Sequence, residues 1–114
     1  MAGTLIINEK DDWLPAGWLF DNVLNEIVTQ LPPSEAKLRE ILEKANTKVT
    51  GYADLRGIDG ATFRTFVAAA ERAYEEVTAK GAAAFGDPEF YPGYIARYDD
   101  LRAKLNADPR AANT

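Results

Sequence analysis

The 114-residue chain contains no cysteine and no histidine, and these two absences exclude more chemistry than any motif in the chain assigns. Without thiols or imidazoles there are no disulfides, no Ser-His-Asp or Cys-His catalytic groups, and no haem or zinc ligands of those types. A chain without disulfides is compatible with a reducing cytosol. The sequence therefore points to a binding surface rather than to a reactive pocket.

Long apolar runs and an excess of basic residues are also missing. The first residues hold only the short apolar run 5–7 without a basic region, and no stretch approaches the roughly 18 apolar residues of a membrane helix. We therefore expect a cytoplasmic protein that does not contact membranes. The 13 Lys and Arg against 18 Asp and Glu give a net charge of −5. This balance disfavours direct nucleic-acid binding, because affinity for phosphate backbones comes mainly from Lys and Arg.

The length and composition indicate one folded unit. Apolar residues make up 46% and charged residues 27% of the chain, as in soluble globular proteins. A chain of this size is long enough for one core and too short for two ordinary domains. We expect a single helical domain over residues 1–107 and a small, polar, frayed tail over residues 108–114.

Apolar residues recur at three-to-four-residue spacing in four stretches, and this periodicity predicts four helices. The first is expected over residues 16–31, where Pro32 and Pro33 stop it. Ser34 is the expected N-cap of the second, since a serine hydroxyl can accept from the free N–H groups of the first turn.

The third helix has the clearest boundaries, and the fourth has a clear end but an ambiguous start. Asp59 is expected to cap the third helix, and Gly81 to end it. The fourth runs to about Asn106, but its start is ambiguous because Pro92 would break a helix begun at residue 87. Residues 87–91 either begin this helix or form a separate turn.

Two short segments, 4–8 and 48–52, are rich in β-branched or aromatic residues, and each is compatible with a strand. A lone pair of strands is marginal unless it packs on helices. The predicted fold class is therefore mostly α, a compact bundle of about four helices. The two segments form either a two-stranded β element on that bundle or extended linkers.

The net charge is concentrated in residues 1–36. One base, Lys10, stands there against six acids, whereas acids and bases are equal in number over residues 37–114. One interpretation is an acidic face complementary to a basic protein, which accelerates association and sets its register. The other is a solubilising surface. The six acids are Glu9, Asp11, Asp12, Asp21, Glu26 and Glu35.

Both tryptophans lie in this acidic segment. A tryptophan beside carboxylates is typical of an interface hot spot, where the ring anchors the partner and the charges direct it. Trp18 adjoins the apolar stripe of the first helix and is predicted to be core. Trp13 lies outside that stripe and is the predicted contact. For Asp11 and Asp12, the alternatives are a solvated turn or a helix N-terminal charge.

The loop over residues 52–60 combines two glycines with three charged residues, but it lacks the pattern of a P-loop, a Rossmann turn or an EF-hand. We expect Arg56 to pair with a nearby carboxylate and Asp59 to cap the following helix. The alternative is a partner-binding loop that presents Asp54 and Asp59.

A second aromatic cluster spans residues 85–98. Packing of the fourth helix on the third explains most of it, with one or two tyrosines exposed. Adjacent carboxylates at 11–12, 75–76 and 99–100 do not make a two-carboxylate site, because neighbours on a helix diverge by about 100°. A Mg²⁺ site of carboxylates and water is compatible with the sequence, although no spacing indicates one. We expect no enzyme, no metal and no cofactor.

These observations favour a small acidic inhibitor, by association of class rather than by any motif. The hypothesis is a bacterial immunity protein, antitoxin-like and monomeric in isolation. It would neutralise a basic toxin or nuclease domain by covering the active site, with carboxylates in place of the substrate's phosphates. The alternative is a structural or adaptor protein that forms a homo-oligomer. The predicted partner-binding residues are Asp11, Asp12, Trp13, Asp21, Glu26, Asp54 and Asp59.

Overall fold

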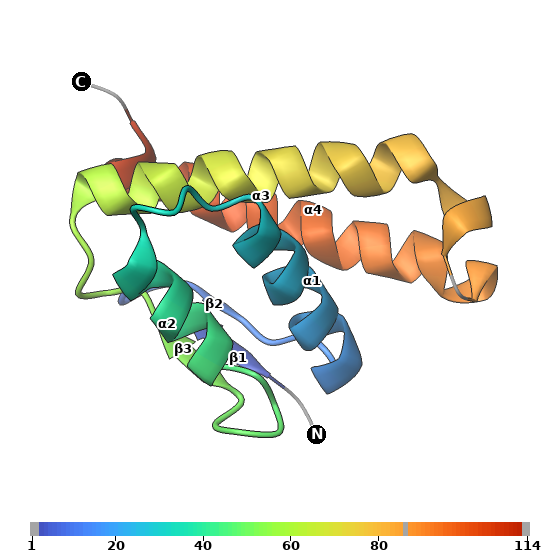
Figure 1. Ribbon diagram of the computed structural model, residues 1–114, viewed down its shortest axis with the longest axis horizontal. Coiled ribbons are helices and arrows are strands. Elements are labelled where there is room, and N and C mark those ends of the chain that lie inside the picture. The colour runs from blue at the N-terminus through green and yellow to red at the C-terminus, as the bar shows by residue number, and fades with distance from the viewer. Residues whose placement is uncertain (1–2, 86, 113–114) are drawn as a thin grey trace.

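Four α-helices and a three-stranded sheet make up the computed structural model, which describes residues 3–85 and 87–112 (Figure 1). The prediction of a mostly helical fold with a short β element is confirmed. No helix within these two ranges is both long and apolar enough to cross a membrane. In chain order the elements are β1 (Thr4–Ile6), β2 (Asp12–Trp13), α1 (Gly17–Thr29), α2 (Ala36–Lys44), β3 (Tyr52–Asp54), α3 (Gly60–Lys80), the 3-10 turns η1 (Ala82–Ala84) and η2 (Pro88–Phe90), α4 (Tyr91–Ala107) and the 3-10 turn η3 (Pro109–Ala111).

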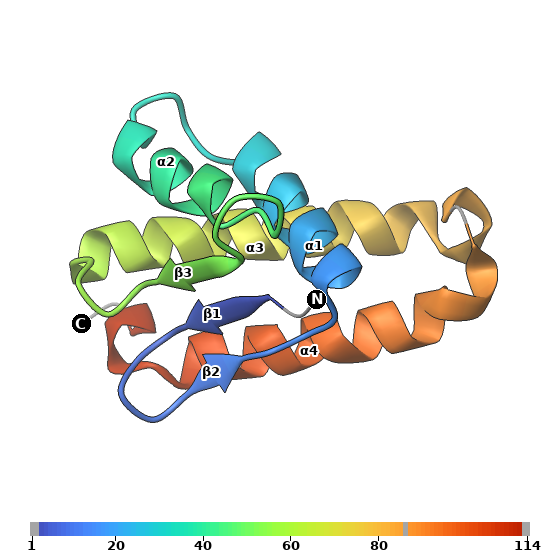
Figure 2. The same cartoon turned by 90° about the horizontal axis from the view of Figure 1, so that it is seen from below.

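The sheet joins three segments that are distant in the sequence. β1 lies in the middle, antiparallel to β2 and parallel to β3. The parallel pair needs a long crossover, which α1 and α2 supply. Leu5 is the register partner of both Trp13 and Ala53, so one row of buried side chains crosses the sheet. Figure 2 shows the sheet in front of α3 and α4.

The two predicted strands have different outcomes. Segment 4–8 contains β1, but most of segment 48–52 is a turn, in which the N–H groups of residues 49–51 donate to the carbonyl oxygen of Asn46. Gly51 has a φ of 66°, a left-handed conformation that suits glycine. β3 therefore begins only at the last residue of that segment. The two-residue strand β2 was not predicted.

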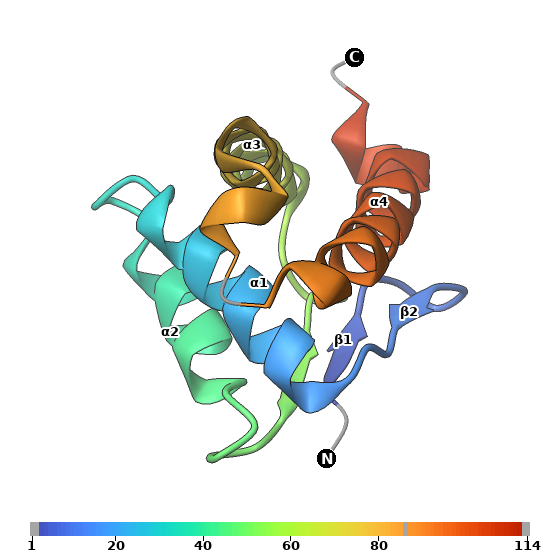
Figure 3. The same ribbon diagram turned by 90° about the vertical axis from the view of Figure 1, so that its right-hand side faces the viewer.

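The helical stripes meet in one core. On α1 and α3 the apolar positions inferred from periodicity face inward, and Phe20, Ile27, Phe63 and Phe66 are all fully buried. α3 and α4 run side by side, joined by η1 and η2 at one end of the molecule, and α1 packs against α3 (Figures 1 and 3). The 3.6-residue period therefore decides which faces meet.

Local residues set both ends of α3, and the proline at the start of α4 is compatible with its first turn. The side chain of Asp59 accepts a 2.7 Å hydrogen bond from the N–H of Thr62, and Gly81 ends the helix with a φ of 70°. Both expectations are confirmed. Residues 88–90 form a separate 3-10 turn, which was one of the two alternatives. Pro92 lies in the first turn of α4, where its missing N–H leaves no helical hydrogen bond unmade.

The predicted cap of α2 is wrong. Glu35 occupies the N-cap position without a side-chain hydrogen bond, and Ser34 is exposed. Arg39 ties α2 to α1 instead, because its guanidinium donates to the carbonyl oxygen of Leu31 at 3.2 Å, just beyond the end of α1. The α1–α2 connection is therefore held by a cation on helix-terminal carbonyls.

The expectation of a frayed tail from residue 108 is wrong for residues 108–112. They contain η3, which packs on α3, and Asp108 there is only 4% exposed. Residues 113 and 114, the rest of the expected tail, lie outside the described residues. The composition of the tail suggested fraying because it shows nothing of the distant groups that bind Asp108 and Arg110.

Gly3 is a position where a single methyl group has a large expected effect. A Cβ added there would lie 2.1 Å from Cγ of the fully buried Phe20 ring. We expect Gly3→Ala to lower the free energy of unfolding by about 1–3 kcal/mol, since the ring must shift in a packed core. Urea unfolding measures this. Gly57→Ala is the control, because no atom lies within 4 Å of its added Cβ. Equal stability of Gly3→Ala and wild type would contradict the packing.

Candidate functional site

A groove of about 710 Å³ opens where α1, the end of α3 and the start of α4 meet. We call it the aromatic groove. Figure 3 looks onto this end of the molecule, with η1 and η2 crossing between α3 and α4 beside α1. The residues that matter most for its character are Trp18, Glu26, Phe85, Asp87, Phe90 and Tyr94.

The chain brings four aromatic rings together here because α3 ends sharply at Gly81. The two short 3-10 turns that follow carry Phe85 and Phe90 back towards α1. Phe85 packs edge-on against Tyr94, with ring centroids 5.0 Å apart. Trp18 stacks on Tyr94 at 6.3 Å and lies 5.9 Å from Phe90. The rings form one continuous wall and floor.

The floor of the groove is held by hydrogen bonds. Tyr94 is 1% exposed, and its hydroxyl donates to Oδ1 of Asn22 at 2.6 Å. Tyr98, one turn further along α4, donates to the carbonyl oxygen of Ala70 at 3.0 Å. Burial raises the pKa of both phenols well above the usual range, and the Glu26 carboxylate raises them further. Both tyrosines therefore remain neutral, fixed donors.

The rings at the mouth of the groove are exposed. Trp18 is 51% and Phe90 55% exposed, and Leu14, at 63%, lines a shallower hollow beside them. Of the five large apolar side chains exposed in the described part of the chain, these three gather here, whereas Val49 and Tyr52 lie elsewhere. Exposed apolar surface concentrated in one place is typical of an interaction site.

Acidic residues slightly outnumber basic ones around the groove. Glu26, Asp87 and Lys80 line the groove, and Glu89 and Arg97 line the hollow next to it. Within residues 3–85 and 87–112 none of these three carboxylates forms an ion pair, whereas Lys80 at the same rim lies 4.0 Å from Glu76. The groove thus presents carboxylates without cationic partners beside exposed rings.

The two tryptophans exchange their predicted roles. Trp13 is 1% exposed, its indole Nε1 donates to the carbonyl oxygen of Arg97 at 3.0 Å, and its ring stacks on Phe20. Trp18, predicted to be core, is half exposed at the groove. The prediction that Trp13 is the contact and Trp18 the core residue is therefore wrong.

The seven predicted site residues do not form one surface. Glu26 lines the aromatic groove, but Asp21 accepts a 2.8 Å hydrogen bond from the N–H of Thr47 and holds the α2–β3 connection to α1. Asp11 is the last residue of the turn between β1 and β2, and Asp12 is the first residue of β2; this turn lies at the opposite end of the molecule from η1 and η2 (Figure 2). The acidic run in the sequence is therefore not an acidic face.

The carboxylates of loop 52–60 have local partners. Arg56 donates to both oxygens of Asp54, at 2.9 and 2.8 Å, and this pairing lowers the pKa of Asp54 to about 2. Asp59 caps α3, and its hydrogen bonds from Thr62 lower its pKa. The structural expectations for this loop are confirmed, and its charges are largely used within the chain.

Sequence reasoning missed Phe85, Phe90 and Tyr94 as groove residues, although it identified the aromatic cluster that contains them. A second pattern was available on the first helix. Trp18, Asn22 and Glu26 follow one another at four-residue spacing, so they lie on successive turns along one side of α1, at the edge of its apolar stripe. An aromatic residue and a carboxylate on one side of a helix together indicate a contact surface.

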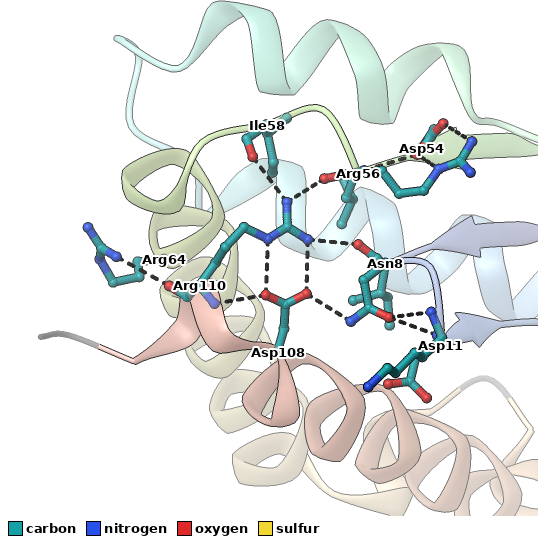
Figure 4. Close-up of polar contacts among 11 residues, drawn as sticks. Asn8, Asp11, Asp54, Arg56, Ile58, Arg64, Asp108 and Arg110 are labelled. Atoms are coloured by element: carbon teal, nitrogen blue, oxygen red, sulfur yellow. Dashed lines mark hydrogen bonds and ion pairs between the residues drawn. The ribbon is translucent and has the colours of Figure 1, made fainter.

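A polar cluster joins the tail to the sheet (Figure 4), and we call it the Arg110 clasp. The Arg110 guanidinium donates one hydrogen bond to each carboxylate oxygen of Asp108, both at 3.0 Å. Its other N–H groups reach the carbonyl oxygens of Ile7, Leu55 and Ile58 at 2.7, 2.7 and 3.0 Å. All five guanidinium donors are satisfied. The clasp therefore fixes three segments of backbone and is a structural feature.

The clasp predicts an acid-dependent loss of stability. The Arg110 guanidinium lowers the pKa of the buried Asp108 carboxyl from 3.8 to about 2. The Asp108 carboxyl therefore binds a proton more readily in the unfolded state than in the folded state. Its contribution to the free energy of unfolding is fully present above pH about 4 and falls by about 2 kcal/mol as the pH approaches 2.

Urea unfolding between pH about 2 and 5 measures this dependence. Asp108→Asn should flatten it. Glu43→Gln is the control, because it removes one carboxyl that is exposed and forms no ion pair within residues 3–85 and 87–112. An unchanged slope in Asp108→Asn would contradict the clasp.

The molecule is thus a small, mostly helical protein with an aromatic groove whose rim carries carboxylates. Its sequence matches no protein-family model and no curated protein. Its backbone is similar to a chain in the structure titled "CdiA-CT toxin from Burkholderia pseudomallei E479 in complex with cognate CdiI immunity protein". The TM-score is 0.76 at 19% sequence identity, and the match covers 97% of this chain and 100% of that chain. The two chains share a fold.

Proposed function

We propose that this chain is an immunity protein, which binds a cognate basic toxin domain and blocks its active site. The observation that carries the proposal is the full-length structural match to a chain of a toxin–immunity complex. Because the match spans both chains almost completely, the similarity extends over the whole fold and is not limited to one motif. It favours a protein partner over a small substrate.

The charge of the chain favours the inhibitor role over the toxin role. A toxin that cleaves nucleic acid binds phosphates and needs basic residues for it. This chain instead has a net charge of −5, no histidine, and carboxylates without partners at its groove. An acidic inhibitor is complementary to a cationic cleft, where its carboxylates occupy the positions of the phosphates.

Binding kinetics test the proposal. We expect the gene immediately upstream to encode a large secreted or toxin-domain protein, and its terminal domain is the probe. The association rate of this domain with the purified chain should fall at least about tenfold between low and high salt, as for electrostatically steered complexes. The isolated chain should remain a monomer in analytical ultracentrifugation.

Two outcomes would contradict the proposal. A concentration-dependent dimer that does not bind the domain would favour the adaptor alternative. Growth arrest on expression of this chain alone would favour the toxin role, since the related complex contains both kinds of protein.

A further inference from the structure

We propose that the aromatic groove is the docking site for the partner and that it receives a basic segment of the toxin domain. An Arg or Lys side chain of that segment lies over Trp18 and Phe90 and pairs with Glu26 and Asp87. This inference rests on the proposed function, and it adds the surface and the chemistry of the contact.

The shape of the groove fits a protein segment. Its volume of about 710 Å³ accommodates several side chains, and its rings are already in place, because Tyr94 is fixed by its hydrogen bond to Asn22. A preorganised wall loses little entropy when a partner binds. Trp18 and Phe90 are each about half exposed, so contact with a partner would remove substantial apolar surface from water.

The charges select a basic occupant. Glu26 on α1 and Asp87 just before η2 both line the groove, and neither forms an ion pair within the described residues, whereas Lys80, which also lines it, lies 4.0 Å from Glu76. A guanidinium or ammonium between them would meet two carboxylates and the faces of two rings. Cation–π contacts with tryptophan, together with charge-directed pairing, are the combination that concentrates binding energy at interfaces.

The other acidic candidate lacks an anchor. Asp11 and Asp12 are close to Trp13, but that ring is buried in the core and cannot contact a partner without unfolding the sheet edge. Exposed carboxylates alone contribute to steering and little to affinity. The aromatic groove therefore carries the stronger inference.

The test measures the dissociation constant of the complex by biolayer interferometry, with the toxin domain encoded upstream as the immobilised probe. Trp18→Ala should weaken binding by at least about 30-fold, as expected for an aromatic hot spot. Phe90→Ala should act in the same direction. Glu26→Gln combined with Asp87→Asn should weaken binding about tenfold, chiefly by slowing association.

Matched controls separate the groove from general effects. Asp11→Asn with Asp12→Asn removes the same charge at the other end of the molecule, and Val49→Ala removes an exposed apolar side chain from the turn before β3. Both should stay within about threefold of wild type. The changed side chains of the groove variants are at the surface, so we expect these variants to remain folded. Their unfolding temperatures check this.

The outcomes of this experiment distinguish a wrong docking site from a wrong function. If the wild-type chain binds the domain but the three groove variants bind within threefold of it, the groove is not the contact and the immunity role stands. If Asp11→Asn with Asp12→Asn weakens binding most, the turn between β1 and β2 is the contact instead. If the wild-type chain does not bind at any concentration, the proposed function itself is wrong.

Discussion

Arg110→Ala is expected to lower the free energy of unfolding by about 3–5 kcal/mol. The substitution leaves the Asp108 carboxylate buried without its counter-ion, and a buried charge that loses its partner is strongly destabilising. It also removes donors from the carbonyl oxygens of Ile7, Leu55 and Ile58, so the sheet, the loop before α3 and the tail lose their common connection. The guanidinium additionally stacks on the ring of Phe63, 4.1 Å from its centroid.

Urea unfolding with two further variants makes this measurement specific. Arg110→Lys keeps the charge but not the planar fork, so it should recover only a minor part of the loss. Arg72→Ala removes an exposed arginine that donates to the carbonyl oxygen of Gln30, and its cost should stay below about 1 kcal/mol. Stability of Arg110→Ala within 1 kcal/mol of wild type would mean that the tail is frayed, as its composition suggests.

Trp13→Ala is expected to cost about 3–5 kcal/mol, whereas Trp18→Ala should cost less than about 1 kcal/mol. Trp13 fills the space between the sheet and α4, stacks on Phe20 and donates its indole N–H to a backbone carbonyl. Trp13→Phe keeps most of the packing but removes the indole hydrogen bond, and it should cost an intermediate amount. Trp18 loses only half of its surface on folding.

Fluorescence of single-tryptophan variants independently measures the difference in exposure between Trp13 and Trp18. In Trp18→Phe the remaining Trp13 should emit at short wavelength and resist quenching by iodide. In Trp13→Phe the remaining Trp18 should emit at longer wavelength and be quenched. Equal quenching of the two tryptophans would contradict the structure.

The features that sequence reasoning predicts well are those with local causes. Pro32 and Pro33 follow α1, Asp59 caps α3, and Gly81 ends it, because each acts on the backbone of its own turn. The apolar stripes of α1 and α3 follow from the helical period. The mostly helical class and the approximate helix boundaries therefore follow from single residues and their spacing.

The features that it misses depend on distant partners. Residues 12–17 are alternately exposed and buried, which is the pattern of a strand, and Trp13 is one of the buried positions. A segment that short was not recognised as a strand, because its pairing with β1 depends on residues elsewhere in the chain. Trp18 lies one residue before the buried Leu19, about 100° away from the apolar stripe. Adjacency to a stripe residue in the sequence therefore does not place a side chain in the core.

The candidate site has the same limitation. The aromatic groove combines the start of α1 with the turns after α3, some seventy residues later, and only folding brings Trp18 next to Phe90 and Tyr94. The net negative charge of residues 1–36 is real, since only one base stands there against six acids, but the strand turn, the contact with Thr47 and the groove divide these acids among separate places. Charge counted along the chain therefore did not locate a surface.

The most direct test of the central claim is a growth-protection assay. Cells that express the toxin domain encoded upstream of this chain are compared with and without co-expression of the chain. The account predicts growth arrest by the domain alone and normal growth when this chain is present, with protection reduced in Trp18→Ala and retained in Val49→Ala. Arrest that persists in the presence of the wild-type, folded chain would contradict the account.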